Sequence, residues 1–180
     1  PRLTEKGFKI KEVETRAAVA LLSRNIRIVS EDCADYSADQ CLGMKEEQGN
    51  YFGGHTVVRQ GFKQYQVQGV EFHQLGQGGR AARMPVNFFL TRVAPEQTFV
   101  RDCSINESMT HWIELRGAQN VYLERNVGYK SIGHGFVLAD GTEINNTLRG
   151  NIGILARASV KNRQNPRAVP GILSDLGSKD

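Results

Sequence analysis

The chain has 180 residues, and its 23 basic and 19 acidic residues give a formal net charge of +4. This charge permits an acidic partner, but no concentrated basic tract or nucleic-acid motif is present, so we expect no nucleic-acid partner. A hydrophobic fraction of 39% argues against disorder, and no apolar run approaches the roughly 18 residues of a membrane helix. We expect one domain with a sizeable core. Because the chain begins at Pro1, we interpret it as a segment or mature fragment.

Short apolar segments follow one another along most of the chain. They are rich in Val, Ile, Phe and Tyr and are separated by Gly, Asn, Asp and Ser, a pattern typical of β-strands. Residues 15–22 form either an amphipathic helix or a strand that leads into 25–28, and we favour the strand. Further strands are predicted at 57–58, 65–72, 86–90, 99–105, 112–115, 121–123 and 135–138.

A weak internal repeat organises these strands. Gly117 and Gly141 end similar apolar segments 24 residues apart. Each glycine is followed by a second apolar strand, around Leu123 and Leu148, with the related sequences Leu-Glu-Arg-Asn-Val-Gly and Leu-Arg-Gly-Asn-Ile-Gly. A period of about 23–25 residues with two or three short strands per period indicates a solenoid, in which stacked coils bury a continuous core.

We therefore predict an all-β fold, a right-handed parallel β-helix. A leucine-rich repeat has a similar period, but its consensus is missing, and a β-sandwich remains the alternative because it also has short strands with regular turns. Asn126 and Asn151 occupy equivalent places in the repeat. We expect them to form a ladder in which each side chain satisfies backbone groups of the next coil.

Three segments interrupt the period. We predict a β-helix over residues 1–161 that contains a polar insertion at 30–50, a Gly-rich mobile loop at 74–82, and a linker or tail over 162–180. Cys33 and Cys41 bracket a short polar stretch that suits a disulfide-closed loop, since no second ligand pair for a metal lies nearby. A disulfide would place the protein in an oxidising compartment, and Cys103 is expected to be a buried free thiol.

A series of motifs in fixed order resembles one known family. The motifs lie at residues 14–26, 52–55, 69–72, 83–90, 127–136 and 140–143, and the spacing of Cys33 and Cys41 is similar too. Over about residues 12–160 they resemble the β-helix of the cell migration-inducing hyaluronidase family, which includes a transmembrane hyaluronidase and, more distantly, the fibrocystin-like proteins. The resemblance implies a secreted or cell-surface protein that binds or depolymerises hyaluronan.

The central strand departs from this family. Its members typically have Arg-Tyr-Pro-Ile-His-Phe-His where this chain has Arg83 to Phe89, so that Asn87 and Phe89 occupy the two histidine positions. Alternate residues of a strand face the same side, so the two histidines would point together as ligands or acid–base groups. Asn cannot act as a base near neutral pH and Phe cannot bind a metal. We expect binding to persist and catalysis to be weak or absent.

Three residues are candidates for ligand binding. The guanidinium of Arg83 matches the geometry of a sugar carboxylate. His55 lies in a Gly-Gly-His motif, and Asn87 lies four residues after Arg83, at the first histidine position.

Three more residues are candidates for catalysis. His134 follows Gly133 in a turn and matches a Gly-His motif of the family. Asp140 and Glu143 flank an Asp-Gly turn, where they could serve as a carboxylate pair for glycoside cleavage or bind Ca²⁺, the one cofactor that the sequence suggests. Each of these residues also has a purely structural interpretation, and we interpret His73 and His111 as structural. No cluster with metal-ligand spacing is present.

Two sequons, at Asn106 and Asn145, match the glycosylation pattern of secreted proteins. The leading hypothesis is an extracellular segment that binds an acidic polysaccharide with weak or no catalysis. The alternatives are a hyaluronidase-like depolymerase and a structural β-solenoid whose open ends stack on further coils or on neighbouring subunits.

Overall fold

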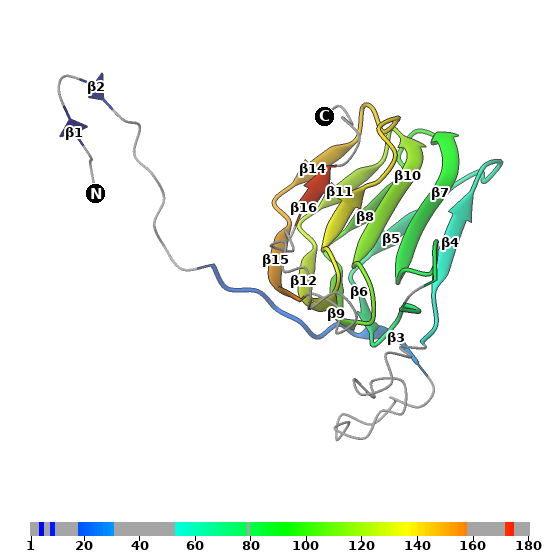
Figure 1. Ribbon diagram of the computed structural model, residues 1–180, viewed down its shortest axis with the longest axis horizontal. Coiled ribbons are helices and arrows are strands. Elements are labelled where there is room, and N and C mark those ends of the chain that lie inside the picture. The colour runs from blue at the N-terminus through cyan, green and yellow to red at the C-terminus, as the bar shows by residue number, and fades with distance from the viewer. Residues whose placement is uncertain are drawn as a thin grey trace.

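The computed structural model describes residues 4–5, 8–9, 18–30, 53–78, 80–157 and 172–174. All regular elements in these ranges are β-strands, and apart from the short antiparallel pair β1 (Thr4–Glu5) and β2 (Phe8–Lys9) every pairing is parallel. The strands form three sheets that surround one core (Figure 1). The predicted parallel β-helix is confirmed, and the β-sandwich alternative is wrong because its sheets would be antiparallel.

Each sheet contains one strand from each successive coil. We name the sheets after their central strands. The β7 sheet has the order β16 (Ile172–Ser174), β13 (Phe136–Leu138), β10 (Ile113–Gln119), β7 (Val86–Val93) and β4 (Thr56–Arg59). The β8 sheet has the order β14 (Thr147–Arg149), β11 (Tyr122–Glu124), β8 (Phe99–Arg101) and β5 (Gln66–Gln68). The β9 sheet has the order β15 (Ile152–Arg157), β12 (Val127–Ile132), β9 (Ser104–Ser108), β6 (Val70–His73) and β3 (Ile26–Val29).

The core follows from the two-residue alternation of each strand. In the β7 sheet, Val58, Phe88 and Leu115 are paired in register and all are buried in the core cluster. The ring of Trp112 packs edge-on against Phe136, with 5.5 Å between the ring centroids. Residues between these inward positions face away from the core, so each sheet has an outer face on which function can be built.

The coil turns sharply from the β8 sheet to the β9 sheet. Residues predicted as single strands at 65–72 and 99–105 are each divided here, at Gly69 and at Asp102. Both residues have positive φ, as have Arg125 and Gly150 at the same place in later coils. We call this turn the ladder corner; it comprises residues 69, 102–103, 125–126 and 150–151.

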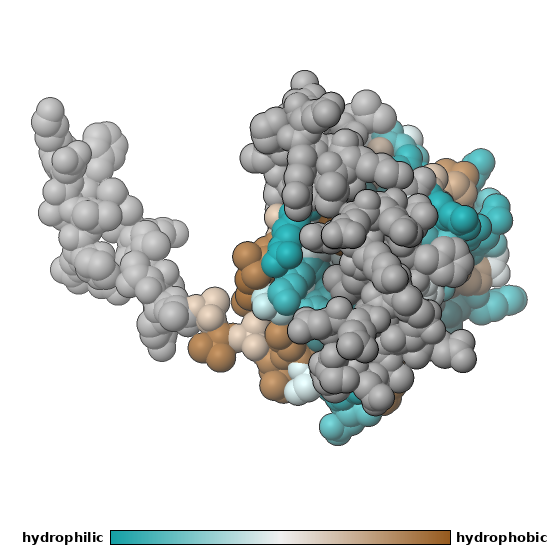
Figure 2. Space-filling model, turned by 60° about the horizontal axis from the view of Figure 1, so that its bottom comes forward, coloured by the Kyte–Doolittle hydropathy of each residue, from teal (hydrophilic) through white to brown (hydrophobic). Residues whose placement is uncertain are grey.

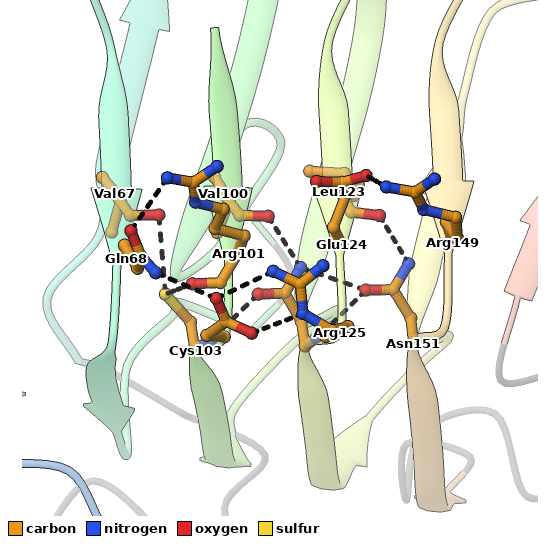
Figure 3. A network of polar contacts seen from close by, with 12 residues as sticks. Val67, Gln68, Val100, Arg101, Cys103, Leu123, Glu124, Arg125, Arg149 and Asn151 are labelled. Atoms are coloured by element: carbon orange, nitrogen blue, oxygen red, sulfur yellow. Dashed lines mark hydrogen bonds and ion pairs between the residues drawn. The ribbon is translucent and has the colours of Figure 1, made fainter. Parts of the chain in front are cut away.

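The predicted asparagine ladder lies at the ladder corner and is confirmed (Figure 3). Asn126 Oδ1 accepts from the backbone N–H of Cys103, 23 residues earlier, and Asn126 Nδ2 donates to the Val100 carbonyl. Asn151 Oδ1 in turn accepts from the Asn126 backbone N–H, 25 residues earlier, at 2.9 Å. These intervals agree with the predicted coil length. Cys103 occupies the ladder position one coil below Asn126 and is a buried free thiol, as expected.

The coil turns less regularly from the β9 sheet to the β7 sheet. This histidine corner, as we name it, comprises residues 53–55, 74–78, 80–85, 109–112 and 133–135. The mobile loop predicted at 74–82 is wrong for its first residues, because Gln74 to Gln77 are buried. Backbone hydrogen bonds join Gly76 to Gly53 and Gly54, which fixes the corner to the coil below it.

The N-terminal segment crosses the outer face of the β9 sheet before it forms β3. Residues 18–24 are neither strand nor helix, so the strand predicted at 15–22 is wrong over its described part, whereas the strand around 26–28 is confirmed. The Leu22 carbonyl accepts from the side chains of Ser104 and Asn106, and Arg24 donates to the Asp102 carbonyl at 2.8 Å. Ahead of these contacts the segment is an exposed apolar strip (Figure 2).

Other predictions concern the ends and the insertion. Within 162–180, predicted as a linker, residues 172–174 form β16 and pair in parallel with β13. The insertion at 31–50, with Cys33 and Cys41, lies outside the described residues, so their disulfide stays a prediction. No helix long and apolar enough to cross a membrane occurs in the described part of the chain.

Candidate functional site

The two positions that carry histidine in the family lie on the outer face of the β7 sheet. Phe88 points into the core, so Asn87 and Phe89 face outward, as the alternation predicts. Asn87 is nevertheless fully buried, and its Nδ2 lies 3.7 Å from the Met84 sulfur. Its Oδ1 accepts no hydrogen bond from any described residue. This outer face is therefore covered at Asn87 and more open at Phe89, which is half-buried.

Guanidinium groups flank the open part of this face. Arg59 on β4 and Arg116 on β10 are both paired in register with Phe89 on β7. The Arg59 guanidinium lies 5.9 Å from the centre of the Phe89 ring, a favourable arrangement of a cation over an aromatic face. Arg116 forms an ion pair with the buried Glu114, with 2.9 Å between Nε and Oε1. The three strands thus present a row of cation, aromatic ring and cation.

The structure brings together two of the predicted ligand-binding residues. Arg83 Nη1 and His55 Nε2 are 2.8 Å apart at the histidine corner, where His55 directly precedes β4. Burial and the Arg83 charge lower the pKa of His55. A neutral imidazole can accept a hydrogen bond from the Arg83 guanidinium at Nε2, so this pair presents one positive charge to solvent. Arg83 is exposed and therefore available to a ligand.

His134 lies at the histidine corner beside a residue that we interpreted as structural. Its ring stacks on that of His111, with 5.4 Å between the centroids, and the His111 Nδ1 atom is 3.2 Å from the His134 carbonyl oxygen. Burial lowers the pKa of His111 to about 4, and the nearby charges of His134 and Arg116 act in the same direction. The only sign of this pair in the sequence is that the two histidines are 23 residues apart, which is one coil.

Asp140 and Glu143 are engaged in a turn that follows β13. Glu143 is fully buried and accepts from the backbone N–H groups of Gly117, Asp140 and Gly141. Asp140 Oδ1 accepts from both the backbone N–H and the hydroxyl of Thr142. Burial tends to raise the pKa of Asp140, but its hydrogen bonds with Glu143 and Thr142 and the charge of Arg116 outweigh burial and lower it. Glu143 thus joins this turn to the coil below, whereas Asp140 stabilises the turn itself.

The predicted catalytic residues do not converge. His55 and His134 stand at the starts of β4 and β13, with β7 and β10 between them, a separation of about 14 Å at the usual strand spacing. Asp140 and Glu143 follow the opposite end of β13 from His134. Among the described residues no group of three or more His, Cys, Asp or Glu side chains could hold a metal ion. The carboxylates suggested for Ca²⁺ already accept hydrogen bonds from backbone N–H groups.

The two sequons differ in exposure. Asn145 is exposed in the turn before β14. Asn106 is 6% exposed, and its Nδ2 donates to the Leu22 carbonyl beneath the N-terminal segment. A glycan on Asn106 would displace this segment, so the geometry favours Asn145 as the acceptor.

Sequence reasoning missed the outer face of the β8 sheet. There Arg101 stacks on Phe99, with 4.1 Å from the guanidinium carbon to the ring centre. Arg101 also donates to Gln68 (Figure 3). Tyr122, one coil above Phe99, is exposed. The 23-residue interval between Phe99 and Tyr122 could have predicted that they are neighbours, because positions one coil apart lie side by side on the same face.

The chain is similar to known proteins over most of its length. Residues 51–174 match the family model described as the CEMIP beta-helix. The chain is 31% identical over 169 residues to the human cell migration-inducing and hyaluronan-binding protein, which covers 88% of this chain. It is 32% identical over 166 residues to the human cell surface hyaluronidase CEMIP2, covering 87% of the chain, and 33% identical over 148 residues to communication mutant protein F of Dictyostelium discoideum, covering 82%.

The chain spans only 12% of the length of each of these three relatives. No solved structure matches it. The family model and these relatives confirm the resemblance that the ordered motifs indicated. The parallel coils of the structure agree with this match, and the chain belongs to the CEMIP β-helix family.

Proposed function

We propose that this chain is an extracellular or cell-surface β-helix segment that binds an acidic polysaccharide of the hyaluronan type, with weak catalysis or none. The observation that carries the proposal is the row Arg59–Phe89–Arg116 across three adjacent coils, together with Arg83 beside His55 at the histidine corner. Neighbouring coils repeat at about 4.8 Å, so a polysaccharide lying along the solenoid axis would meet successive coils with successive sugars.

The chemistry of the row suits a polymer of uronic acids. A guanidinium pairs with a carboxylate through two parallel hydrogen bonds, and an aromatic ring supports the apolar face of a sugar. Glu114 is the acidic residue on the same strand face and pairs with Arg116, so the uncompensated positive charge of the row is that of Arg59. Two human relatives are named for hyaluronan binding and for hyaluronidase activity, which supports this ligand class.

Weak or absent catalysis follows from the replaced histidines. Asn87 and Phe89 remove both imidazoles, and Asn87 is buried away from any substrate. The carboxylates of Asp140 and Glu143 accept backbone hydrogen bonds, which leaves them poorly placed to donate or accept a substrate proton. A depolymerase that uses His134, Asp140 and Glu143 would have to rearrange the turn after β13.

Binding is tested by titration of hyaluronan oligosaccharides at two salt concentrations. Arg83→Ala and Arg59→Ala should each weaken binding about ten- to a hundredfold, the loss of one charge-assisted hydrogen bond, and affinity should fall as salt rises. Lys63→Ala, which removes an exposed charge outside the row, should bind as the wild type does. Absence of wild-type binding at low salt would contradict the proposal and favour a structural spacer. Binding that ignores salt and both arginines would show that another surface is used.

Catalysis is tested by incubation with high-molecular-weight hyaluronan followed by size analysis. The wild type should leave the polymer length unchanged, whereas efficient shortening would contradict the proposal. The double substitution Asn87→His with Phe89→His restores both imidazoles. Shortening by this variant alone, with its fold verified by circular dichroism, would identify the replaced histidines as the reason for inactivity.

A further inference from the structure

The outer face of the β8 sheet is hollowed into a depression of about 730 Å³. It lies on a different sheet from the row Arg59–Phe89–Arg116, so the two surfaces are separate sides of the solenoid (Figure 1). The residues that line it come from three coils and from the turns before β8 and β11: Gln66, Glu96, Gln97, Phe99, Arg101, Asn120, Tyr122 and Glu124.

The coils stack the outward residues of this sheet in two ladders. Gln66, Phe99, Tyr122 and Thr147 are in register in one ladder, and Gln68, Arg101, Glu124 and Arg149 form the other. Val67, Val100 and Leu123 alternate with them and face the core. The aromatic pair therefore occupies adjacent coils in the middle of the sheet, with polar side chains above and below it.

Two of the charged groups that line the depression, Arg101 and Glu124, are held by neighbouring side chains. The Arg101 guanidinium covers the Phe99 ring and donates to Gln68 Oε1 at 3.0 Å. Glu124 accepts from Arg149 at 2.5 Å (Figure 3). The lining contains one arginine and two glutamates, Glu96 and Glu124, so its charge does not attract a polyanion.

Uncharged groups remain free to recognise a ligand. Tyr122 is 38% exposed and offers an aromatic ring and a hydroxyl to solvent. Gln66 Nε2 donates to the Gln97 carbonyl and Asn120 Nδ2 donates to the Ala94 carbonyl. Within the described ranges the amide oxygens of Gln66 and Asn120 accept no hydrogen bond, so each side chain is held through its amide nitrogen and keeps a free acceptor.

We propose that this depression is a second carbohydrate site, which takes a neutral saccharide whose ring stacks on Tyr122 and whose hydroxyl or N-acetyl groups bond to the amides of Gln66 and Asn120. An amphipathic aromatic ring gives a large contact at low entropic cost, and a few fixed polar groups around it give orientation. The site stands on observations independent of the proposed function, because it shares no residue with the cationic row.

The site is tested by NMR titration of the isotope-labelled chain with chitotetraose, a neutral oligomer. Amide resonances of β8 and β11 should shift, and the dissociation constant should not change between low and high salt. Tyr122→Ala should weaken binding about tenfold, as expected for loss of an aromatic stacking contact, whereas Tyr122→Phe should remain within about threefold of the wild type.

The matched control is Tyr129→Ala, which removes a half-buried tyrosine from the outer face of the β9 sheet. It should leave chitotetraose binding unchanged. Absence of shifts in β8 and β11 at millimolar sugar, or equal weakening by Tyr122→Ala and Tyr129→Ala, would overturn the proposal. Arg83→Ala should not affect this titration, so failure of hyaluronan binding and failure of the neutral site are separate results.

Discussion

The ladder corner and the histidine corner turn the same chain between sheets of the same core, yet they are built differently. The ladder corner needs one or two residues in every coil and repeats the same bonds between Cys103, Asn126 and Asn151. The histidine corner varies in length: only residues 133–135 separate β12 from β13, whereas a much longer segment separates β6 from β7. It carries Arg83, His55 and the stacked histidine pair. One corner thus fixes the register of the solenoid, which leaves the other free to vary and to carry chemistry.

Removing a ladder side chain should cost the most stability. Asn126→Ala leaves the Cys103 N–H and the Val100 carbonyl buried without their side-chain partner, and we expect the free energy of unfolding to fall by about 3 kcal/mol. Urea denaturation followed by circular dichroism measures this loss. Arg83→Ala at the histidine corner should change it by less than about 0.5 kcal/mol. Equal losses for the two variants would show that the corners do not divide their roles in this way.

The histidine corner should instead make stability depend on pH. The pKa of His111 is about 4 in the folded protein against an ordinary value of 6.5, so the unfolded state binds more protons between these values. The contribution of the neutral His111 to the free energy of unfolding is therefore fully present above pH 6.5. It falls as the pH drops toward 4, with a loss of about 2 kcal/mol at pH 5. Denaturation at pH 7 and pH 5 tests this. The pKa values of His55 and His73 are lowered too, so these residues also make stability depend on pH. The control is therefore the variant His111→Asn, whose free energy of unfolding should change less between pH 7 and pH 5 than that of the wild type.

Substitutions of glycine at the two corners should also affect stability differently, by smaller amounts than the changes above. Gly150 at the ladder corner has a φ of 66°, close to that of Asp102 and Arg125, so Gly150→Asn should change stability by less than about 0.5 kcal/mol. Gly133 at the histidine corner has a φ of 124°, and a Cβ there would lie 3.1 Å from the His111 ring. Gly133→Asn should therefore destabilise by about 1–2 kcal/mol. A loss at Gly150 as large as that at Gly133 would contradict the distinction.

The features that sequence reasoning predicted are those that repeat. The period, most strands and the Asn126–Asn151 ladder follow from an interval that recurs along the chain, because stacked coils place equivalent residues side by side. The outward direction of Asn87 and Phe89 follows from strand alternation. The fixed interval thus predicted the fold, and the two-residue alternation predicted the face of the central strand.

The features that sequence reasoning missed depend on contacts between unlike segments. The burial of Asn106 depends on the N-terminal segment, and no local sequence pattern predicts that this segment lies over the β9 sheet. The pairing of Arg83 with His55 joins residues of two irregular turns of different length. The turn role of Glu143 became visible only when Gly117 was placed beside it by the coil below. Each of these contacts joins segments that are far apart in the sequence and unrelated by the repeat, so neither segment alone predicts it.

The backbone hydrogen bonds between coils give the molecule different mechanical strength along different directions. Strands of successive coils pair in parallel, so these bonds run along the axis of the solenoid and each coil is held chiefly by its two neighbours. A pull along that axis would load one inter-coil interface and separate the coils one after another. A pull along the strands would load all bonds of a sheet in shear at once. A β-helix segment of this kind would therefore yield stepwise to tension on its axis and resist tension across it.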